Sequence, residues 1–126
     1  MVPISPGELL DKITILRIKA ARIEDADKLD NVRRELALLE QLWQQSVAAP
    51  AELSADEAAL ERVNGRLWDI EDRIREHEAR HSFDSAFVEL ARAVYLNNDE
   101  RAAIKQRINR RLSSALIEEK SYAPYR

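Results

Sequence analysis

The sequence contains no cysteine, and glycine and proline are scarce, with two and four among 126 residues. The lack of cysteine excludes disulfide bonds, thiolate metal ligands and cysteine nucleophiles. Because glycine and proline interrupt helices, their scarcity, together with 45% hydrophobic and 34% charged residues, is typical of packed helices and unlike β-sandwiches or disordered chains. We therefore predict an all-α protein without a sheet, and we expect residues 1–126 to form a single helical domain.

A strong net charge and long hydrophobic runs are also missing. With 23 acidic and 20 basic side chains the formal charge is -3, so the chain has no overall attraction to nucleic acid or to anionic membranes. The N-terminal residues show neither the charged leader nor the apolar core of a signal peptide, and no apolar stretch reaches the length of a membrane span. We therefore expect a cytoplasmic protein without a membrane span, and we do not expect nucleic acid as a partner.

Capping signals and hydrophobic spacing predict the helices of the first half. Ser5 and Glu8 form a capping box at the start of a first helix. The apolar stripe before residues 24–27 and the stripe after them lie about 180° apart on a helical wheel. A single straight helix would not bury both stripes on one side. We therefore predict a break in this segment, where Asp25 or Asp27 caps the next helix.

The second half is predicted to contain a loop and three further helices. Residues 47–53 form the main loop, and Ser54 with Glu57 is a second capping box, which starts a helix that runs to about Arg80. A shorter helix follows and ends at residues 97–99, whose Asn-Asn-Asp sequence would cap a last helix. The prediction is an antiparallel bundle of about five helices, with long helices in the first half.

The helix expected to start at Ser54 needs more cover than its neighbours provide. It would be about 40 Å long, and the helices on either side are expected to be shorter. Its apolar stripe is covered either by two helices that lie end to end or by a second copy of the chain. We therefore predict a homodimer, with another protein as the alternative partner.

The sequence from His77 to His81, His-Glu-Ala-Arg-His, matches the H-E-x-x-H pattern of zinc metalloproteases. In that pattern two histidines on one helix face bind zinc, and the glutamate activates water. A third protein ligand is needed, and the downstream acids Glu89 and Glu100 follow no recognisable third-ligand spacing. The simpler interpretation is a charged helix tip. We predict no metal and no cofactor, with a zinc site at His77 and His81 as a remote alternative.

Five basic side chains lie between residues 101 and 111 of the last predicted helix. On a helical wheel two of them, Arg101 and Lys105, flank an apolar stripe, while the other three point outward. The first two could line an anion-binding groove, and the outer three could contact nucleic acid or acidic lipid headgroups. Alternatively, the whole cluster pairs with acids of the third helix and stabilises the bundle. The basic residues are Arg101, Lys105, Arg107, Arg110 and Arg111.

Six segments, spread over both halves of the chain, together match the sequence pattern of one protein family. They are 3–9 (PISPGEL), 11–16 (DKITIL), 28–32 (KLDNV), 67–72 (LWDIED), 98–105 (NDERAAIK) and 118–122 (EEKSY). On these segments the chain resembles the bacterial domain-of-unknown-function family numbered 6165. That family has no assigned activity. Its members often lie beside, or are joined to, glycosyltransferases and other cell-surface polysaccharide proteins, which implies an accessory role in such systems. The family pattern does not require the two histidines.

The resemblance centres on polar blocks in three parts of the chain. If these blocks converge, they form a polar pocket of mixed charge, which would be the functional site. Our leading hypothesis is a non-catalytic interaction or accessory module, so we do not expect an enzyme. The alternative is a small-anion-binding or enzymatic pocket built from these blocks. The candidate ligand-binding residues are Asp11, Lys12, Asn98, Asp99, Arg101, Lys105, Lys120 and Tyr122.

Overall fold

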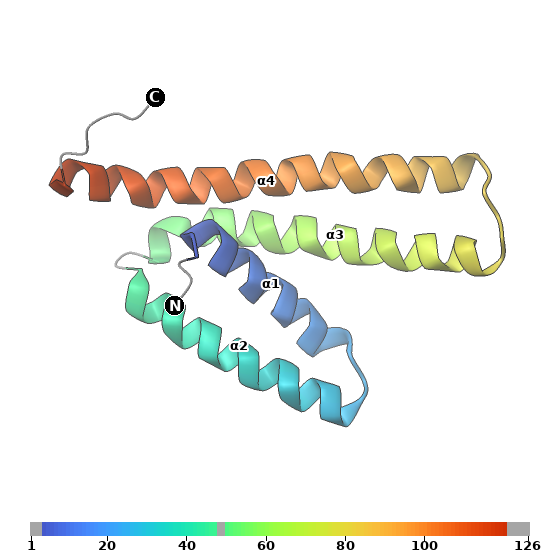
Figure 1. Cartoon of the computed structure of the whole chain (residues 1–126), viewed down its shortest axis with the longest axis horizontal. Coiled ribbons are helices and arrows are strands. Elements are labelled where there is room, and N and C mark those ends of the chain that lie inside the picture. Colours follow the sequence, from blue (N-terminus) through green and yellow to red (C-terminus); the bar gives the residue numbers. More distant parts are fainter. Residues whose placement is uncertain (1–3, 48–49, 121–126) are drawn as a thin grey trace.

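The computed structural model describes the backbone of residues 4–47 and 50–120 and the side chains of residues 4–47 and 52–112. Every regular element in these residues is helical, which confirms the predicted all-α class. The prediction of about five helices is corrected to four α-helices within the described backbone (Figure 1). They are α1 (Pro6–Arg22), α2 (Ala26–Ser46), α3 (Ser54–Ala79) and α4 (Ser85–Lys120), and a short 3₁₀ helix, η1 (Pro50–Leu53), precedes α3.

The starts of α1 and α2 follow the capping residues that the sequence predicts. Ser5 Oγ accepts a hydrogen bond from the Glu8 N–H at 3.2 Å, and Pro6 lies in the first turn of α1. Asp25 Oδ1 accepts a hydrogen bond from the Lys28 N–H at 3.0 Å, at the start of α2. The predicted break between the first two helices is therefore confirmed.

The start of α3 differs from the prediction. The predicted capping box of Ser54 and Glu57 is wrong, because Leu53 is the N-cap of α3 and no described side chain caps that helix start.

The helix α4 is continuous over 36 residues, so the predicted helix end at residues 97–99 is wrong. The Asn97 side chain forms hydrogen bonds within α4 and to α3 instead of capping a new helix. Its Nδ2 donates to the Ala93 carbonyl at 2.8 Å, and its Oδ1 accepts from Arg66 Nε of α3 at 2.9 Å. The long helices also lie in the second half and not in the first, because α1 and α2 have 17 and 21 residues whereas α3 and α4 have 26 and 36.

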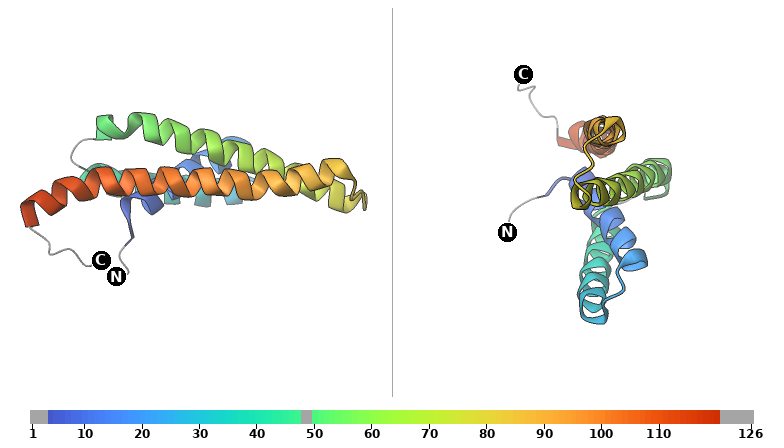
Figure 2. Two further views of the ribbon diagram at one scale, coloured as in Figure 1. Left: turned by 90° about the horizontal axis from the view of Figure 1, so that it is seen from above. Right: turned by 90° about the vertical axis from the view of Figure 1, so that its right-hand side faces the viewer.

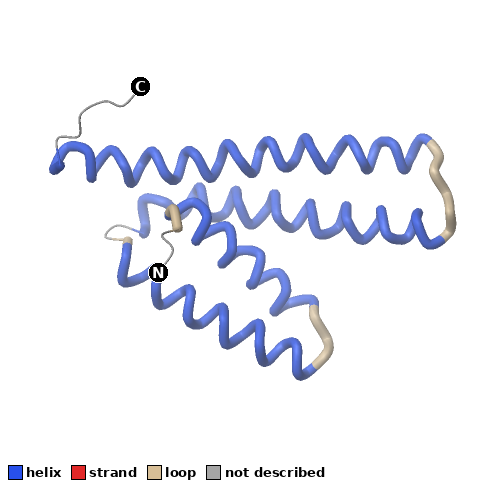
Figure 3. The backbone as a smooth tube through the Cα atoms, in the orientation of Figure 1, coloured by secondary structure: helices blue, strands red, loops and turns tan. Residues whose placement is uncertain are grey.

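The four helices form two antiparallel hairpins of different length. The long hairpin is α3 with α4, and the short one is α1 with α2. The helix α1 packs against both α3 and α4, and an end-on view places the short hairpin to one side of the long one (Figure 2). Loops of a few residues join the helices within each hairpin (Figure 3). The long hairpin extends well beyond α1 (Figure 1), and we call residues 70–99, which contain this part, the outer hairpin.

The core lies where α1 crosses the long hairpin. Leu10 and Ile13 of α1, Leu60 and Val63 of α3, and Ile108 of α4 are all 0% exposed. Burying one such aliphatic side chain stabilises a fold by about 1.5–3 kcal/mol. Outside this core the helices carry many charged residues, and none of the helices described is both long and apolar enough to cross a membrane.

Candidate functional site

Asp11 and Arg101 form the centre of the candidate site. Asp11 lies on the buried face of α1, and Arg101 reaches it from α4 with two hydrogen bonds, Nε to Oδ1 at 2.9 Å and Nη2 to Oδ2 at 2.5 Å. The side chain of Asp11 is 2% exposed and that of Arg101 is 29% exposed. A bidentate pair of this kind fixes the plane of the guanidinium group. Asp11 therefore holds Arg101 in one orientation at the edge of the core.

Two further polar side chains complete the surroundings of Asp11. Asn64 of α3 donates through Nδ2 to Asp11 Oδ1 and to Thr14 Oγ1, both at 2.9 Å. Thr14 Oγ1 in turn donates to the Asp11 carbonyl oxygen at 2.8 Å. Buried polar groups cost stability unless they are hydrogen-bonded, and here α1, α3 and α4 supply the partners for one another. The cluster therefore fixes the relative positions of three helices.

These contacts also determine the charge states of the pair. Burial alone would raise the pKa of Asp11, but the hydrogen bonds from Arg101 and Asn64 and the positive charge of Arg101 hold this pKa below its ordinary value. The hydrogen bonds to Asp11 raise the pKa of Arg101. A general acid or base works best with a pKa near the working pH. Asp11 instead stays a carboxylate near neutral pH and acts as a clamp for Arg101.

Lys105 joins the cluster through Glu8 of α1. Its Nζ pairs with Glu8 Oε1 and lies 3.9 Å from Asp11 Oδ2. Each of the two basic side chains from α4 therefore faces a carboxylate from α1. Within the described side chains, the charges of Arg101 and Lys105 are balanced by those of Glu8 and Asp11, so an anion would be held here by hydrogen bonds and not by an excess of positive charge.

Two of the three predicted blocks come together in this cluster. Asp11, Arg101 and Lys105 converge, and Asn98 lies beside them, with its Oδ1 accepting from Arg101 Nη1 at 3.3 Å. The structure therefore brings together the predicted block of the first helix and the predicted block in the middle of α4.

The remaining predicted residues are not part of this cluster as far as the described side chains show it. Lys12 and Asp99 are exposed and make no hydrogen bond or ion pair with the cluster there. Lys120 and Tyr122 belong to the predicted block near the C-terminus, and their side chains lie outside the described residues.

Thr14 and Asn64 belong to the cluster but were not among the residues that the sequence singled out. Asn64 carries a recognisable signal, because it interrupts the apolar stripe of α3 between Val63 and Leu67 and is 4% exposed. A polar side chain on a buried helix face must find a partner inside the protein. The pattern therefore indicates a buried hydrogen bond at Asn64, although it does not identify Asp11 as the acceptor.

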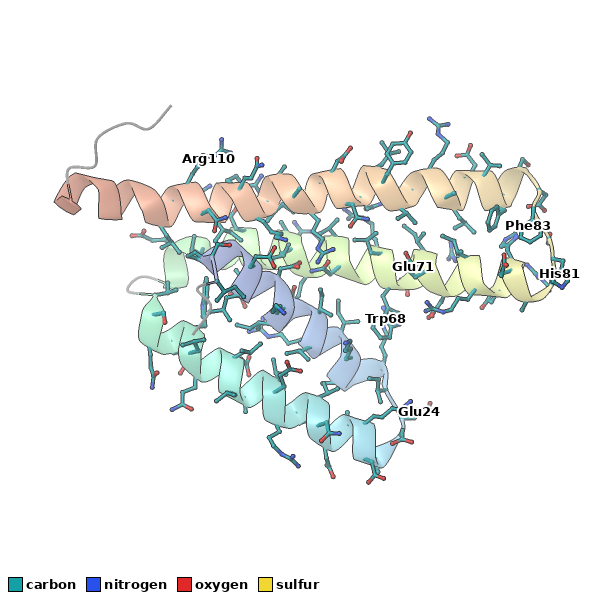
Figure 4. The ribbon with its side chains drawn as sticks, in the orientation of Figure 1. Glu24, Trp68, Glu71, His81, Phe83 and Arg110 are labelled. Atoms are coloured by element: carbon teal, nitrogen blue, oxygen red, sulfur yellow. The ribbon has the colours of Figure 1, made fainter. Side chains whose placement is uncertain are left out.

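An open groove of about 440 Å³ lies beside Arg101. This volume falls within the range of small-ligand sites in proteins. Trp68 projects from α3 towards the end of α1, and Glu71 lies further along α3 (Figure 4). Because the walls mix apolar and polar side chains, the groove suits a ligand or peptide segment with both kinds of group. The lining residues are Ile15, Asn64, Leu67, Trp68, Glu71, Arg75, Asn98 and Arg101.

Comparison with known proteins relates the chain to one family. A family model described as a family of unknown function (DUF6165) matches residues 1–125. The chain belongs to this family. Comparisons with curated proteins and with solved structures give no significant match. Membership in this family assigns no chemistry.

The basic residues beyond Lys105 are used mainly to hold α4 against α3. Asp56, in the first turn of α3, has a side chain that is 4% exposed and lies 2.9 Å from Arg107 Nε and 2.8 Å from Arg111 Nε. Arg110 points away from α3 on the outer side of α4 (Figure 4). These pairs favour the interpretation that the basic cluster stabilises the bundle, with α1 supplying the partners of Arg101 and Lys105.

The two histidines do not share a helix face, so that part of the H-E-x-x-H prediction is wrong. The helix α3 ends at Ala79, and His81 has a left-handed φ of 51°. The N–H groups of His81 and Ser82 donate back to the carbonyls of Glu78 at 3.1 Å and His77 at 2.9 Å, which is the Schellman arrangement of helix ends. Among the residues described, no group of three or more His, Asp or Glu is placed to hold a metal ion.

Proposed function

We propose that this chain is a non-catalytic interaction module that contacts a protein partner through the outer hairpin. The observation that carries the proposal is the exposure of large apolar side chains at its tip and along α4. Between residues 83 and 96, several of them are 52–54% exposed. Large exposed apolar side chains gathered in one part of a folded protein support an interaction site there. The residues are Phe83, Val88, Tyr95 and Leu96.

The charge state of the polar cluster supports a structural role for it in such a module. Arg101 and Lys105 are already paired with carboxylates of α1, and the pKa of Asp11 is lowered away from the range of an acid–base catalyst. We extend the proposal to an accessory role in cell-surface polysaccharide systems, the setting that the family resemblance implies.

Site-specific photo-crosslinking in cells that produce the chain tests the interaction surface. A photoreactive phenylalanine derivative replaces Tyr95 in one variant and Leu38 of α2 in the control, where the two native side chains are 53% and 65% exposed. We expect a discrete covalent adduct from position 95 and none from position 38, and mass spectrometry of peptides from the adduct identifies the partner. Equal labelling from both positions, or no adduct from position 95, would contradict the proposal.

A second candidate function is the binding of a small carboxylate in the groove beside Arg101. The specific observation in its favour is the orientation of the guanidinium group. Nε and Nη2 face Asp11, whereas Nη1 makes only a 3.3 Å contact with Asn98 and keeps hydrogen-bonding capacity for a ligand. A fixed guanidinium in a groove that an indole ring also lines suits an organic carboxylate with an apolar part.

The fluorescence of Trp68 tests this second candidate. The chain has two tryptophans, of which Trp43 is buried in the core and Trp68 lines the groove. The substitution Trp43→Phe therefore leaves Trp68 as the single tryptophan. We expect benzoate to change the fluorescence in a saturable way in this background. Asn98→Asp places a carboxylate beside Arg101 and should abolish the response, whereas Gln106→Asp, which adds the same charge at an exposed position of α4, should keep it. Loss in both variants, or no saturable response at all, counts against ligand binding here.

A further inference from the structure

One face of α4 is packed at one end and open at the other. Residues that recur at intervals of three and four along a helix form a single row, as in the seam of a coiled coil. On α4 such a row contains Val88, Ala91, Tyr95, Asn98, Ala102, Lys105 and Asn109, and we call it the α4 seam.

The C-terminal end of the α4 seam is covered by α1 of the same chain. Lys105 pairs with Glu8, and Asn109 Oδ1 accepts a hydrogen bond from the Gly7 N–H at 2.7 Å. The seam positions from Val88 to Ala102 are all exposed, and none of them carries a charge. Figure 1 shows α4 continuing past α1 towards the loop of the long hairpin. The seam therefore has a helix on it at one end and, within the described residues, no helix on it at the other.

The charges beside the open part of the α4 seam indicate what covers it. Arg92 and Asp99 flank the seam on the same side, and their midpoint falls between residues 95 and 96. An antiparallel second copy, related by a two-fold axis at this midpoint, places its Asp99 opposite Arg92 and its Arg92 opposite Asp99. In a parallel copy in register, Arg92 and Asp99 would instead face the positions of Phe87 and Val94, which carry no charge. Opposite charges at flanking positions determine the partner and the orientation of paired helices.

Arg92 forms only a long ion pair with another described side chain of its own chain. Its contact with Glu89 is 4.0 Å long, and both side chains are more than half exposed. An exposed ion pair one helical turn apart contributes little to stability, so Arg92 can turn towards a partner at little cost. Tyr95 lies next to the proposed axis, where its ring and that of the second copy would be buried against each other.

From these observations we infer that a second copy of this chain packs antiparallel on the α4 seam, about a two-fold axis beside Tyr95. The inference rests on the proposed function and specifies the partner of the same surface. A closed, two-fold contact of this kind buries the same residues of both copies and leaves no open end for further addition. A helix of a different protein on the seam is the competing outcome in the tests below.

Single-cysteine variants test the position of the contact, because the chain contains no cysteine of its own. Tyr95→Cys and the control Leu38→Cys are treated as purified proteins with a short bismaleimide, after circular dichroism has confirmed that both are folded. We expect a covalent dimer from Tyr95→Cys and none from Leu38→Cys. A dimer from the control alone, or a wild-type protein that sediments as a monomer at every concentration up to the millimolar range, overturns the inference.

A charge swap tests the orientation. Arg92→Asp and Asp99→Arg each replace attractions across the axis with repulsions, and each should raise the dimer dissociation constant measured by sedimentation by about tenfold. The double variant restores opposite charges and should return the constant to near the wild-type value. Glu35→Arg, at an exposed position of α2, makes the same kind of charge change away from the seam and should change the constant little. A double variant as weak as the single ones excludes the antiparallel pairing.

The failure of this inference is distinguishable from the failure of the proposed function. If the purified chain is monomeric while photo-crosslinking from position 95 captures a different protein, self-pairing is wrong and the interaction module stands. If position 95 captures nothing in cells, the proposed interaction surface is wrong as well.

Discussion

The N–H of Gly7 donates to Oδ1 of Asn109 at 2.7 Å, at the point where α1 crosses α4. A Cβ atom on residue 7 would lie 2.6 Å from the carbonyl oxygen of Lys105, closer than non-bonded atoms pack. A backbone atom cannot move aside as a flexible side chain can. The missing side chain of Gly7 therefore sets how closely α1 sits on α4, and with it the position of Asp11 opposite Arg101.

Gly7→Ala should destabilise the protein because the new methyl group overlaps the α4 backbone. We expect the free energy of unfolding, measured in urea, to fall by about 1–3 kcal/mol, the usual effect of overpacking. Gly65→Ala is a matched control in α3, where a Cβ meets no atom within 4 Å. That substitution should be neutral or should stabilise by about 0.5–1 kcal/mol, because alanine favours a helix more than glycine does. A Gly7→Ala protein as stable as the wild type would show that the crossing is not close-packed.

Asp11→Asn should destabilise the fold through Arg101, which would lose its charged partner. Breaking a buried ion pair leaves one charge uncompensated, and we expect the free energy of unfolding to fall by about 3 kcal/mol. The value is at the low end for such pairs because Arg101 keeps some contact with water. Urea denaturation measures the loss, and Lys12→Gln at the exposed neighbouring position should change stability by less than about 0.5 kcal/mol. If Lys12→Gln costs as much as Asp11→Asn, Asp11 does not act as a clamp.

The lowered pKa of Asp11 makes part of the stability depend on pH. The folded state binds this proton less readily than the unfolded chain, whose carboxyl has an ordinary pKa of 3.8. The stabilisation is therefore complete above the unfolded pKa and is lost as the pH falls through the folded pKa. We expect the difference in unfolding free energy between wild type and Asp11→Asn to be constant from pH 7 to about pH 5 and to shrink below about pH 4.

Asp84 gives the acid response a second component. The hydrogen bond from the Phe87 N–H lowers the pKa of this carboxyl, so Asp11→Asn should keep part of the loss of stability at low pH. The measurement is a set of urea midpoints from pH 7 to pH 3 for both proteins. If the difference between wild type and variant stays constant over this range, the contacts with Arg101 do not lower the pKa of Asp11.

Local sequence features predict the caps of α1 and α2, but neither the start of α3, which no described side chain caps, nor the continuation of α4 past residues 97–99. Ser5 and Asp25 cap through N–H groups three residues away, so a short stretch of sequence contains all the information. Asn97 has the same capping ability, but its side chain bonds to Ala93 within α4 and to Arg66 of α3. Such tertiary partners override a local preference, and the sequence around residue 97 does not show them.

The sequence predicts only some residues of the polar cluster, because the contacts between them join distant parts of the chain. The polar blocks at Asp11 and Arg101 stand out through the family resemblance, but their pairing joins residues 90 positions apart and depends on how α1 crosses the long hairpin. Asn64 is visible as a polar interruption of an apolar stripe, without its partner. The histidine motif fails because one residue, His81, takes a left-handed φ and ends the helix on which the motif depends.

Arg17 is the point at which three helices meet through their charges. Its guanidinium group pairs with Glu40 of α2 at 3.1 Å and with Glu57 and Glu61 of α3 at 2.6 and 3.1 Å. Burial alone would lower the pKa of Arg17, but the hydrogen bonds to the three glutamates raise it. A single positive charge therefore holds together three carboxylates from two helices.

Arg17→Gln should consequently reverse the effect of salt on stability. In the wild type, added NaCl screens the attraction between Arg17 and the glutamates, whereas in the variant it screens the repulsion that remains among them. We expect the variant to be less stable by about 1 kcal/mol at low salt, and the difference to become smaller as NaCl is raised from about 0.05 to 0.5 M. Urea denaturation at several salt concentrations measures this, with Arg110→Gln, an exposed arginine on the outer side of α4, as the control. A difference from wild type that is independent of salt would mean that Arg17 stabilises the junction by packing and not by its charge.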